Sequence, residues 1–327
     1  MVFEWTLLNN LLTPVSLLFF LGVGVGLVRA DFQFPKGMVF GLSVYLMVAI
    51  GLKGGAAFVE NPLNPGAFML IFMGVGMSAF WPFLSFHLLR LTTHLSQKDA
   101  AAVSAHYGSV SVVTFITAAS FCERYHIPYA TSLVAVLSLM EAPAIFSGLF
   151  MARKDHTKTF STSMNKKLLR EVFSSGPIVL LLGSFLIGSI TGSAGFTKIK
   201  AFYGDPFQGV LSLFLLEMGL SVAHKFHEMK KITPSLFAFG IYMPVVGACV
   251  GITLCWLMGF DQGTAFLFGI LCASSSYIAV PACLKIALPE ASPSLYMPLS
   301  LGVTFPFNII AGIPFYFWIT KMLYAFG

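Results

Sequence analysis

The sequence predicts an all-α membrane protein in which ten transmembrane helices form two inverted five-helix repeats. Of the 327 residues, 57% are hydrophobic and only 10% are charged, whereas a soluble domain has about 25% charged residues. The apolar residues also occur in blocks of about 17–25, the length that spans a bilayer as a helix. Because so few charges cannot cover a surface in water, we expect lipid to surround most of the chain.

Ten apolar segments follow one another along the chain. The first five are 12–28, 37–52, 66–89, 99–121 and 128–152, and the second five are 174–191, 205–223, 234–258, 262–287 and 294–320. The most polar stretch, from Arg153 to Arg170, lies between the two sets. We therefore expect a first repeat at 1–152, a cytoplasmic linker at 153–172 and a second repeat at 173–327.

The positions of Lys and Arg predict how the chain is oriented. If the N-terminus is outside, all but five of the 19 Lys and Arg residues lie in or beside cytoplasmic loops, as the positive-inside rule requires. Both termini are then outside, in a multi-pass protein of the inner (plasma) membrane. The net charge of +6 does not indicate nucleic acid, because the basic residues form no continuous face.

The two halves of the chain share a weak sequence repeat. Gly51 and Leu52 are followed by Phe58, and Gly219 and Leu220 are followed by Phe226 at the same spacing. Five helices per repeat is an odd number, so a second copy must be inverted in the membrane. Inverted repeats of this kind are typical of secondary transporters.

Two segments at matching positions of the halves are rich in hydroxyl groups and contain a helix breaker, Gly108 in one and Pro281 in the other. Interrupted helices free backbone groups inside the membrane, where half-helix N-termini can bind an anion and carbonyl and hydroxyl oxygens a cation. The alternative is that these hydroxyls only pack helices or bond to their own helix backbone. We favour a substrate site that contains Ser109, Ser111, Thr114, Ser274, Ser275 and Ser276.

Ionisable side chains inside the apolar segments are further candidates. A charged group in the membrane is costly and by default has a function. Glu141 lies in the 128–152 segment and Glu217 in the 205–223 segment, where pairing with Lys53 or Lys285 is the alternative role for Glu217. His106 can titrate near neutral pH, although a hydrogen bond to a backbone carbonyl would equally explain it.

Other classes of function lack a motif. The chain has no GxSxG, HExxH or P-loop sequence, and its five cysteines have no metal-ligand spacing with a histidine. An enzyme that used His106, Ser109 or Ser111 would lack a base and orienting group at motif spacing. A cation/proton exchanger that uses Glu141 or Glu217 as proton carrier is the alternative to the anion transporter. No bound cofactor or metal is expected, only a transported Na⁺ or H⁺.

Several stretches resemble the sodium-dependent bicarbonate transporter family known from cyanobacteria, and more closely its broad bacterial branch. They are Gly51–Gly55, Tyr107–Phe115, Met140–Ala144, Ala273–Pro281 and Pro289–Gly312. The resemblance implies a fold similar to bile-acid symporters and sodium/proton antiporters. The third to fifth and eighth to tenth segments would form a core that moves like an elevator against a gate of the other four. The interrupted helices would cross at the site. A cytoplasmic regulatory protein and a homo-oligomer are further partners that it allows.

The resemblance also carries over site residues by position. The family has Ser-Gly-Ser-Thr at 111–114, Ser-Ser-Ser-Asp at 274–277 and Asp at 141, where this chain has Ser-Val-Val-Thr, Ser-Ser-Ser-Tyr and Glu. It implies a small anion, such as bicarbonate, moved by cation symport. Glu141, His106 and Tyr277 would then couple transport to a cation or proton. Because Tyr277 replaces a carboxylate, we expect weak sodium dependence and a role for protons at Glu141.

Overall fold

The computed structural model describes residues 14–60, 65–152, 176–225, 232–277 and 279–325. The linker predicted at 153–172 lies outside them. Every regular element in the described ranges is a helix. Seven helical stretches, three of which join more than one of the elements named below, are long and apolar enough to cross a membrane. Phe72, Phe80 and Ile190 are each at least three-quarters exposed, as side chains that face lipid would be. The predicted all-α membrane class is confirmed.

Helices occur in each of the predicted apolar segments. In the first half they are α2 (Pro14–Leu27), α3 (Lys36–Glu60), α4 (Pro65–Thr92), α5 (Gln97–Gly108), α6 (Val112–Arg124), α7 (Leu133–Leu139) and α8 (Glu141–Met151). In the second half they are α10 (Gly176–Tyr203), α11 (Phe207–Lys225), α12 (Pro234–Leu257), α13 (Gln262–Ala273), α14 (Ala279–Ala287), α15 (Pro293–Met297), α16 (Phe305–Phe307) and α17 (Ile313–Ala325).

Two further segments are irregular in ways that the sequence analysis did not anticipate. The 128–152 segment is divided between α7 and α8. The 294–320 segment has π-helical turns at Pro298–Thr304 and Asn308–Gly312, so it bends between α15 and α17. Proline is the physical reason in the second case, because Pro298 and Pro306 lack the N–H that a regular helix would bond.

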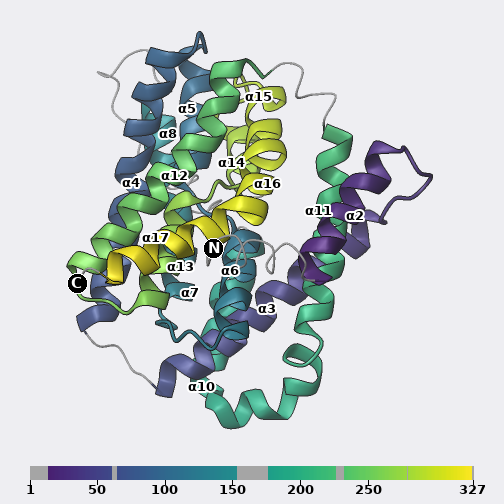
Figure 1. Cartoon of the computed structure of the whole chain (residues 1–327), viewed down its shortest axis with the longest axis vertical. Coiled ribbons are helices and arrows are strands. Elements are labelled where there is room, and N and C mark those ends of the chain that lie inside the picture. The colour runs from purple at the N-terminus through teal and green to yellow at the C-terminus, as the bar shows by residue number, and fades with distance from the viewer. Residues whose placement is uncertain (1–13, 61–64, 153–175, 226–231, 278, 326–327) are drawn as a thin grey trace.

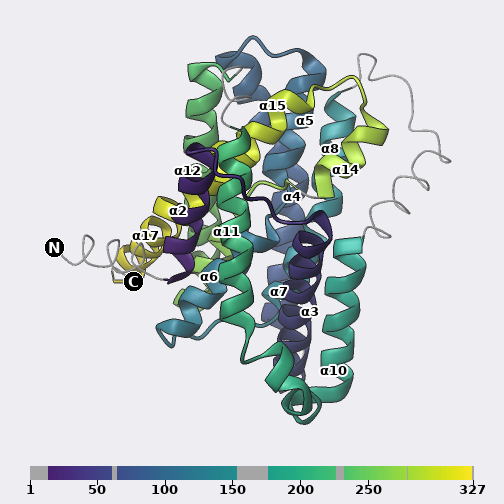
Figure 2. The same cartoon turned by 90° about the vertical axis from the view of Figure 1, so that its right-hand side faces the viewer.

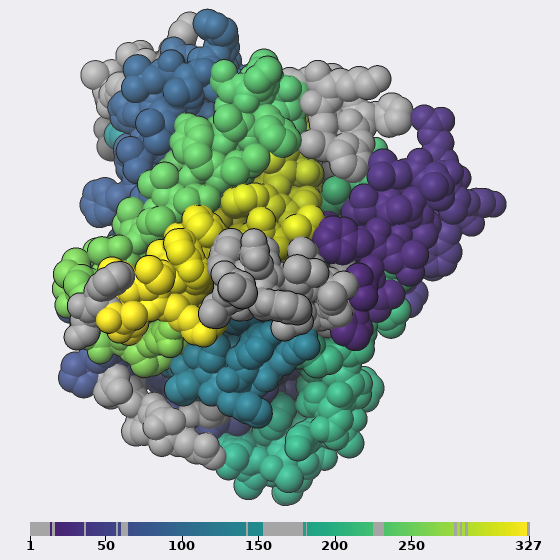
Figure 3. All heavy atoms as spheres, viewed as in Figure 1, coloured from purple at the N-terminus to yellow at the C-terminus, as the bar shows by residue number. Residues whose placement is uncertain are grey.

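The helices form two groups that we call the panel and the bundle. The panel consists of α2, α3, α10 and α11, in which α2 packs on α11 and α3 on α10. The bundle contains all the other helices, and the panel packs along one side of it (Figures 1 and 2). On the face seen in Figure 3, the green α12 and the yellow α17 lie side by side, with panel helices beside them.

Within the panel, α2 and α11 cross at two glycines. A Cβ atom on Gly22 would lie only 2.0 Å from the Leu216 carbonyl oxygen, and one on Gly219 would lie 2.1 Å from the Phe19 carbonyl oxygen. Any side chain at either position would force the two backbones apart. Small residues therefore set this close approach, as they do at many membrane helix crossings.

The α3–α10 crossing repeats this arrangement. A Cβ atom on Gly188 would lie 2.3 Å from the Leu52 carbonyl oxygen, and one on Gly55 would lie 2.0 Å from the Phe185 carbonyl oxygen. Phe19 and Gly22 of α2 thus correspond to Phe185 and Gly188 of α10, and Leu52 and Gly55 of α3 correspond to Leu216 and Gly219 of α11. In this alignment of the two halves Gly219 corresponds to Gly55, whereas the sequence repeat had matched it with Gly51.

Replacing Gly188 by Ala is expected to destabilise the protein by about 1–3 kcal/mol, since the added methyl group overpacks the crossing with α3. Gly183, in the same helix, is the matched control, because a Cβ there meets no atom within 4 Å. Thermal unfolding in detergent should show a lower melting temperature for Gly188→Ala, and an unchanged or slightly higher one for Gly183→Ala, because Ala favours helix over Gly. Equal melting temperatures would contradict the close crossing.

Candidate functional site

The predicted 99–121 segment is interrupted by Ser109–Ser111, which separates α5 from α6. Ser111 is the N-cap of α6, and its Oγ accepts hydrogen bonds from the Thr114 backbone N–H (3.2 Å) and the Thr114 hydroxyl (2.9 Å). A helix has no internal partner for the N–H groups of its first turn. The cap occupies one of them and leaves those of Val112 and Val113 available.

The predicted 262–287 segment is interrupted in the same way, between α13 and α14. The Ser274 hydroxyl donates to the Ile270 carbonyl oxygen (2.6 Å) in the last turn of α13. Ser276 Oγ accepts a hydrogen bond from the Val280 N–H (3.3 Å) in the first turn of α14. Hydroxyl groups therefore take over backbone partners that a continuous helix would supply.

The two interruptions contact each other in the centre of the bundle. The Ser276 N–H donates to the His106 carbonyl oxygen (2.9 Å), which lies just before the end of α5. The Asn308 side-chain amide donates to the Ala273 carbonyl oxygen (2.9 Å) and in turn accepts a hydrogen bond from the Tyr316 hydroxyl (2.9 Å). Buried backbone groups freed by the breaks thus find partners from other segments, which fixes the two breaks side by side.

Glu141 reaches this region because a side chain from α4 enters the helix ladder of the fifth segment. The Ser78 hydroxyl donates to the Met140 carbonyl oxygen and accepts from the Ala144 N–H (3.1 Å), two groups that would otherwise bond each other. The chain ends α7 there and starts α8 at Glu141. Glu141 is only 4% exposed, and its Oε2 has no hydrogen-bond partner in the described part of the chain.

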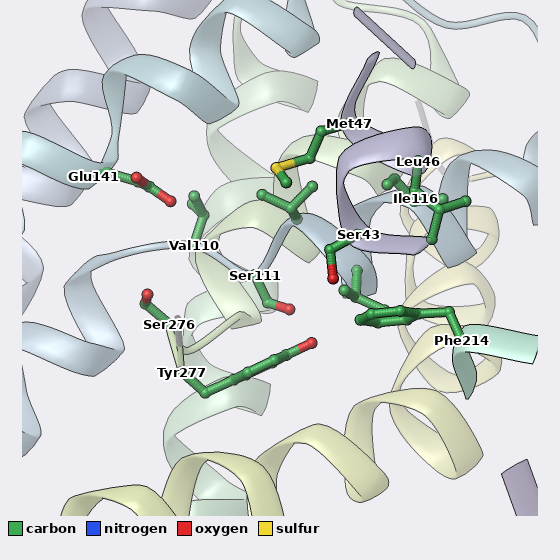
Figure 4. A pocket seen from close by; sticks show the side chains of 12 residues that line it. Ser43, Leu46, Met47, Val110, Ser111, Ile116, Glu141, Phe214, Ser276 and Tyr277 are labelled. Carbon is green, nitrogen blue, oxygen red and sulfur yellow. The ribbon is translucent and has the colours of Figure 1, made fainter. Parts of the chain in front are cut away.

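A cavity lies at this point between bundle and panel (Figure 4). About 30 Å³ of it is open to water-sized molecules, which is room for one or two waters. The bundle side comprises Val110, Ser111, Val112, Val113, Ile116, Glu141, Ser276 and Tyr277, and the panel side comprises Ser43, Leu46, Met47 and Phe214. None of these twelve described residues is Lys, Arg or His.

The sequence model of the Na⁺-dependent bicarbonate transporter superfamily matches residues 14–321. The chain belongs to this superfamily. It is accordingly a transporter and not an enzyme, which confirms the resemblance found in the sequence. Among curated proteins, none matches the chain.

In this superfamily member, four of the nine predicted site residues line the cavity: Ser111, Ser276, Tyr277 and Glu141. Tyr277 extends across the cavity towards Ser111 and Phe214 (Figure 4). It is 8% exposed, and its ring packs edge-on against Phe305 with 5.3 Å between centroids. Its hydroxyl lies beside Ser111 Oγ but makes no hydrogen bond of normal geometry with any described residue.

The other five predicted residues are buried close by but do not line the cavity: Ser109, Thr114, Ser274, Ser275 and His106. His106 Nδ1 bonds the Ala102 carbonyl oxygen (2.7 Å), as a donor, and its ring lies 4.6 Å from the Tyr296 ring. His106 therefore makes the hydrogen bond to a backbone carbonyl that was the alternative explanation for it. Its Nε2, like the hydroxyls of Ser109 and Ser275, has no partner among the described residues.

Glu217 lies on α11, in the panel, near Tyr277 of the bundle. Pairing with Lys53 was one role considered for it, and this is wrong, because Lys53 forms an ion pair with Glu123 of α6 at 2.6 Å. Ser221, one helical turn further along α11, lies near the Glu217 carboxylate. Glu217 Oε2 has no hydrogen-bond partner in the described ranges.

The sequence analysis missed the panel side of the cavity. Ser43, Leu46, Met47 and Phe214 come from α3 and α11, where nothing in the local sequence marks a site. Serine and large apolar residues are ordinary in membrane helices. Only the packing of panel against bundle places them opposite the two interruptions.

Proposed function

We propose that the chain is a secondary active transporter that moves a small anion across the membrane together with a cation. One observation carries this proposal: Glu141 is buried with an unpaired carboxylate oxygen, and it faces the same cavity as the N-terminus of α6. A helix N-terminus attracts an anion. An unpaired carboxylate inside a membrane requires a cation or a proton. The cavity therefore offers complementary positions for two ions of opposite charge.

The predicted hydroxyls fit this assignment to different degrees. Ser111 and Ser276 face the cavity and are the proposed substrate ligands. Thr114, Ser109, Ser274 and Ser275 would support them, Thr114 through its hydrogen bond to Ser111. Bicarbonate is one candidate anion, because the superfamily carries its name. Glu141 and Tyr277 would interact with the coupled cation or proton. His106 would act only through its carbonyl oxygen, which accepts the hydrogen bond from the Ser276 N–H.

We propose an architecture of ten transmembrane helices in two inverted repeats. The repeats are 1–152 and 173–327, and a cytoplasmic linker at 153–172 joins them. The matched glycine crossings support it, because each pairs one helix from either half. So does the equal length of α5 and α13, twelve residues each, which are both followed by a serine as the C-cap. A cysteine introduced at position 160 should react with an impermeant thiol reagent only from the cytoplasmic side, and reaction from outside would refute this orientation.

The panel and the bundle are shifted relative to each other along the long axis of the molecule (Figure 1). An elevator movement, with the panel as gate and the bundle as mobile core, accounts for this shift. In Figure 1 the bundle extends further at the end that carries α5 and α15, whereas α3 and α10 extend further at the other end. Lys53 lies seven residues before the last residue of α3, which is about 10 Å along the helix. Its partner Glu123 is at the very end of α6. With the proposed orientation, this is a state in which the bundle is displaced towards the cytoplasm.

Breaking the Lys53–Glu123 pair is expected to favour the opposite, outward-facing state. The pair is partly exposed, so it contributes about 0–1 kcal/mol and its loss should shift the equilibrium up to about fivefold. Lys53→Gln should therefore raise the rate at which an impermeant thiol reagent applied from outside modifies a cysteine at position 47, measured after the native cysteines have been replaced.

The Lys98–Glu290 pair (2.9 Å) is the matched control, because Lys98 lies on α5 and Glu290 between α14 and α15, so neither partner belongs to the panel. Lys98→Gln should leave the labelling rate unchanged, and exchanging the charges in a Lys53→Glu, Glu123→Lys double variant should restore the parent rate. If Lys53→Gln and Lys98→Gln behave alike, the pair does not report on movement between panel and bundle.

Ion-dependent anion uptake tests the proposed function directly. Purified protein in liposomes should take up a small anion, and uptake should depend weakly on Na⁺, because Glu141 is the one carboxylate among the described residues that line the cavity. It should instead respond to an inward proton gradient in the absence of Na⁺. Steep, saturable Na⁺ dependence without any response to pH would show that this coupling is wrong.

A cation/proton exchanger on the same fold is the second candidate. The unpaired Oε2 of Glu217, on the panel side near Tyr277, favours it, since a second buried carboxylate provides a second protonatable group. Proton flux driven by a Na⁺ or K⁺ gradient in the absence of any permeant anion would support the exchanger. Flux that requires the anion supports the symporter.

A further inference from the structure

The cavity is mostly apolar, which bears on the kind of anion that it accepts. Three of the four panel residues that line it have apolar side chains, Leu46, Met47 and Phe214. The fourth, Ser43, donates its hydroxyl proton to the Val39 carbonyl oxygen of its own helix (3.0 Å). In Figure 4 the Met47 side chain and the Phe214 ring both face the cavity. An anion whose every atom requires a hydrogen bond would leave bonds unmade against this wall.

The polar groups that suit an anion are gathered on the bundle side. The N–H groups of Val112 and Val113 begin α6 and have no partner inside the helix. Tyr277 is only 8% exposed, and its hydroxyl points towards this helix start (Figure 4). The hydroxyl lacks a hydrogen-bond partner among the described residues. Ser111 Oγ accepts two bonds from Thr114, which leaves its own hydroxyl proton to be donated. Four donors therefore converge there, enough for the two oxygens of a carboxylate.

Charge limits the ligand to a monoanion. None of the described residues that line the cavity is Lys, Arg or His, and Glu141 is itself a carboxylate. A dianion would add a second negative charge without a compensating side chain, at a cost that grows in a buried site. A monoanion, with a cation or proton on Glu141, leaves one net negative charge beside the N-terminus of α6, whose partial positive charge can offset part of it. A dianion would leave two.

We infer that the cavity selects a monocarboxylate with a short apolar tail, such as acetate, over bicarbonate. The apolar wall of the panel determines this preference, while Tyr277 donates to the carboxylate and limits the length of the tail. Acetate and bicarbonate have the same shape, except that a methyl group replaces a hydroxyl. With the two oxygens at the start of α6 and at the Tyr277 hydroxyl, the third substituent faces Leu46, Met47 and Phe214. A methyl group gains contact there, whereas a hydroxyl loses a hydrogen bond. The inference rests on the proposed anion site.

Equilibrium binding to detergent-purified protein tests the inference, because binding avoids the leakage of acetic acid through membranes. Radiolabelled acetate would be displaced by unlabelled acetate, propionate or bicarbonate at pH 8, where all three are monoanions, in a sealed vessel with constant Na⁺. The parent protein should bind acetate about tenfold more tightly than bicarbonate. Tyr277→Phe should weaken both about three- to tenfold and leave their ratio unchanged. Tyr277→Ala should enlarge the cavity and improve propionate relative to acetate.

Met47→Gln gives a sharper variant, because it keeps the length of the side chain and places a polar amide on the apolar wall. It should reduce or reverse the preference for acetate. Met69→Gln is the matched control, since Met69 is 41% exposed on α4 and should leave the ratio unchanged. If bicarbonate binds the parent as tightly as acetate does, or if Met47→Gln leaves the ratio of the two affinities unchanged, the inference is wrong while the proposed function stands. If none of the anions binds, the proposed function fails with it.

Discussion

Replacing Glu141 by Gln is expected to abolish accumulation of the solute against its gradient. Gln keeps the size of the side chain but removes the charge, so the cavity loses the group that binds the cation or proton. A hydrogen bond to a charged group contributes about 1.5–3 kcal/mol, so cation affinity should fall about 10- to 150-fold. Uptake against a gradient in proteoliposomes measures the loss. Exchange of labelled for unlabelled solute should persist, because Gln resembles the protonated acid.

Two other carboxylates make the Glu141 prediction specific. Glu290→Gln is the control, since Glu290 lies outside the helices and is paired with Lys98, and its replacement should leave accumulation intact. Glu217→Gln is the competing case. If it abolishes accumulation while Glu141→Gln does not, the coupling group is on the panel and the assignment of Glu141 is wrong.

Replacing Ser111 by Ala is expected to weaken solute binding about two- to tenfold, because the hydroxyl both faces the cavity and orders the first turn of α6. Hydrogen bonds of this kind contribute about 0.5–1.5 kcal/mol. The lost N-cap should also lower stability by about 0.5–2 kcal/mol. Binding and thermal unfolding, measured on the same preparation, separate the two effects.

Ser96 provides the matched control for Ser111. It is the N-cap of α5 and accepts a hydrogen bond from the Asp99 N–H (3.1 Å), at the exposed end of that helix. Ser96→Ala should therefore lower stability by a similar amount without any change in affinity. Ser274→Ala should also have little effect on affinity, since its hydroxyl bonds the Ile270 carbonyl. If all three variants bind solute like the parent, the hydroxyls serve only to pack and cap helices.

Much of the bundle side of the candidate site could be predicted from local sequence. The serines at 109–111 and 274–276 mark the two interruptions, because hydroxyl groups beside Gly or Pro compete with the helix ladder within a few residues. Glu141 stands out because a carboxylate is rare in an apolar segment. The membrane class follows from composition alone, since lipid requires nearly all the surface of a spanning helix to be apolar.

Only the tertiary structure determined which of these residues face a common cavity, and what stands opposite them. The Ser276 N–H meets the His106 carbonyl oxygen, and Ser78 enters the helix at Met140, contacts between segments far apart in the chain. Met47 and Phe214 form the panel wall, although Met and Phe are equally suited to lipid. Because lipid is as apolar as a helix interior, hydrophobicity cannot distinguish a side chain that faces lipid from one that faces the cavity. That distinction depends on how the panel packs against the bundle.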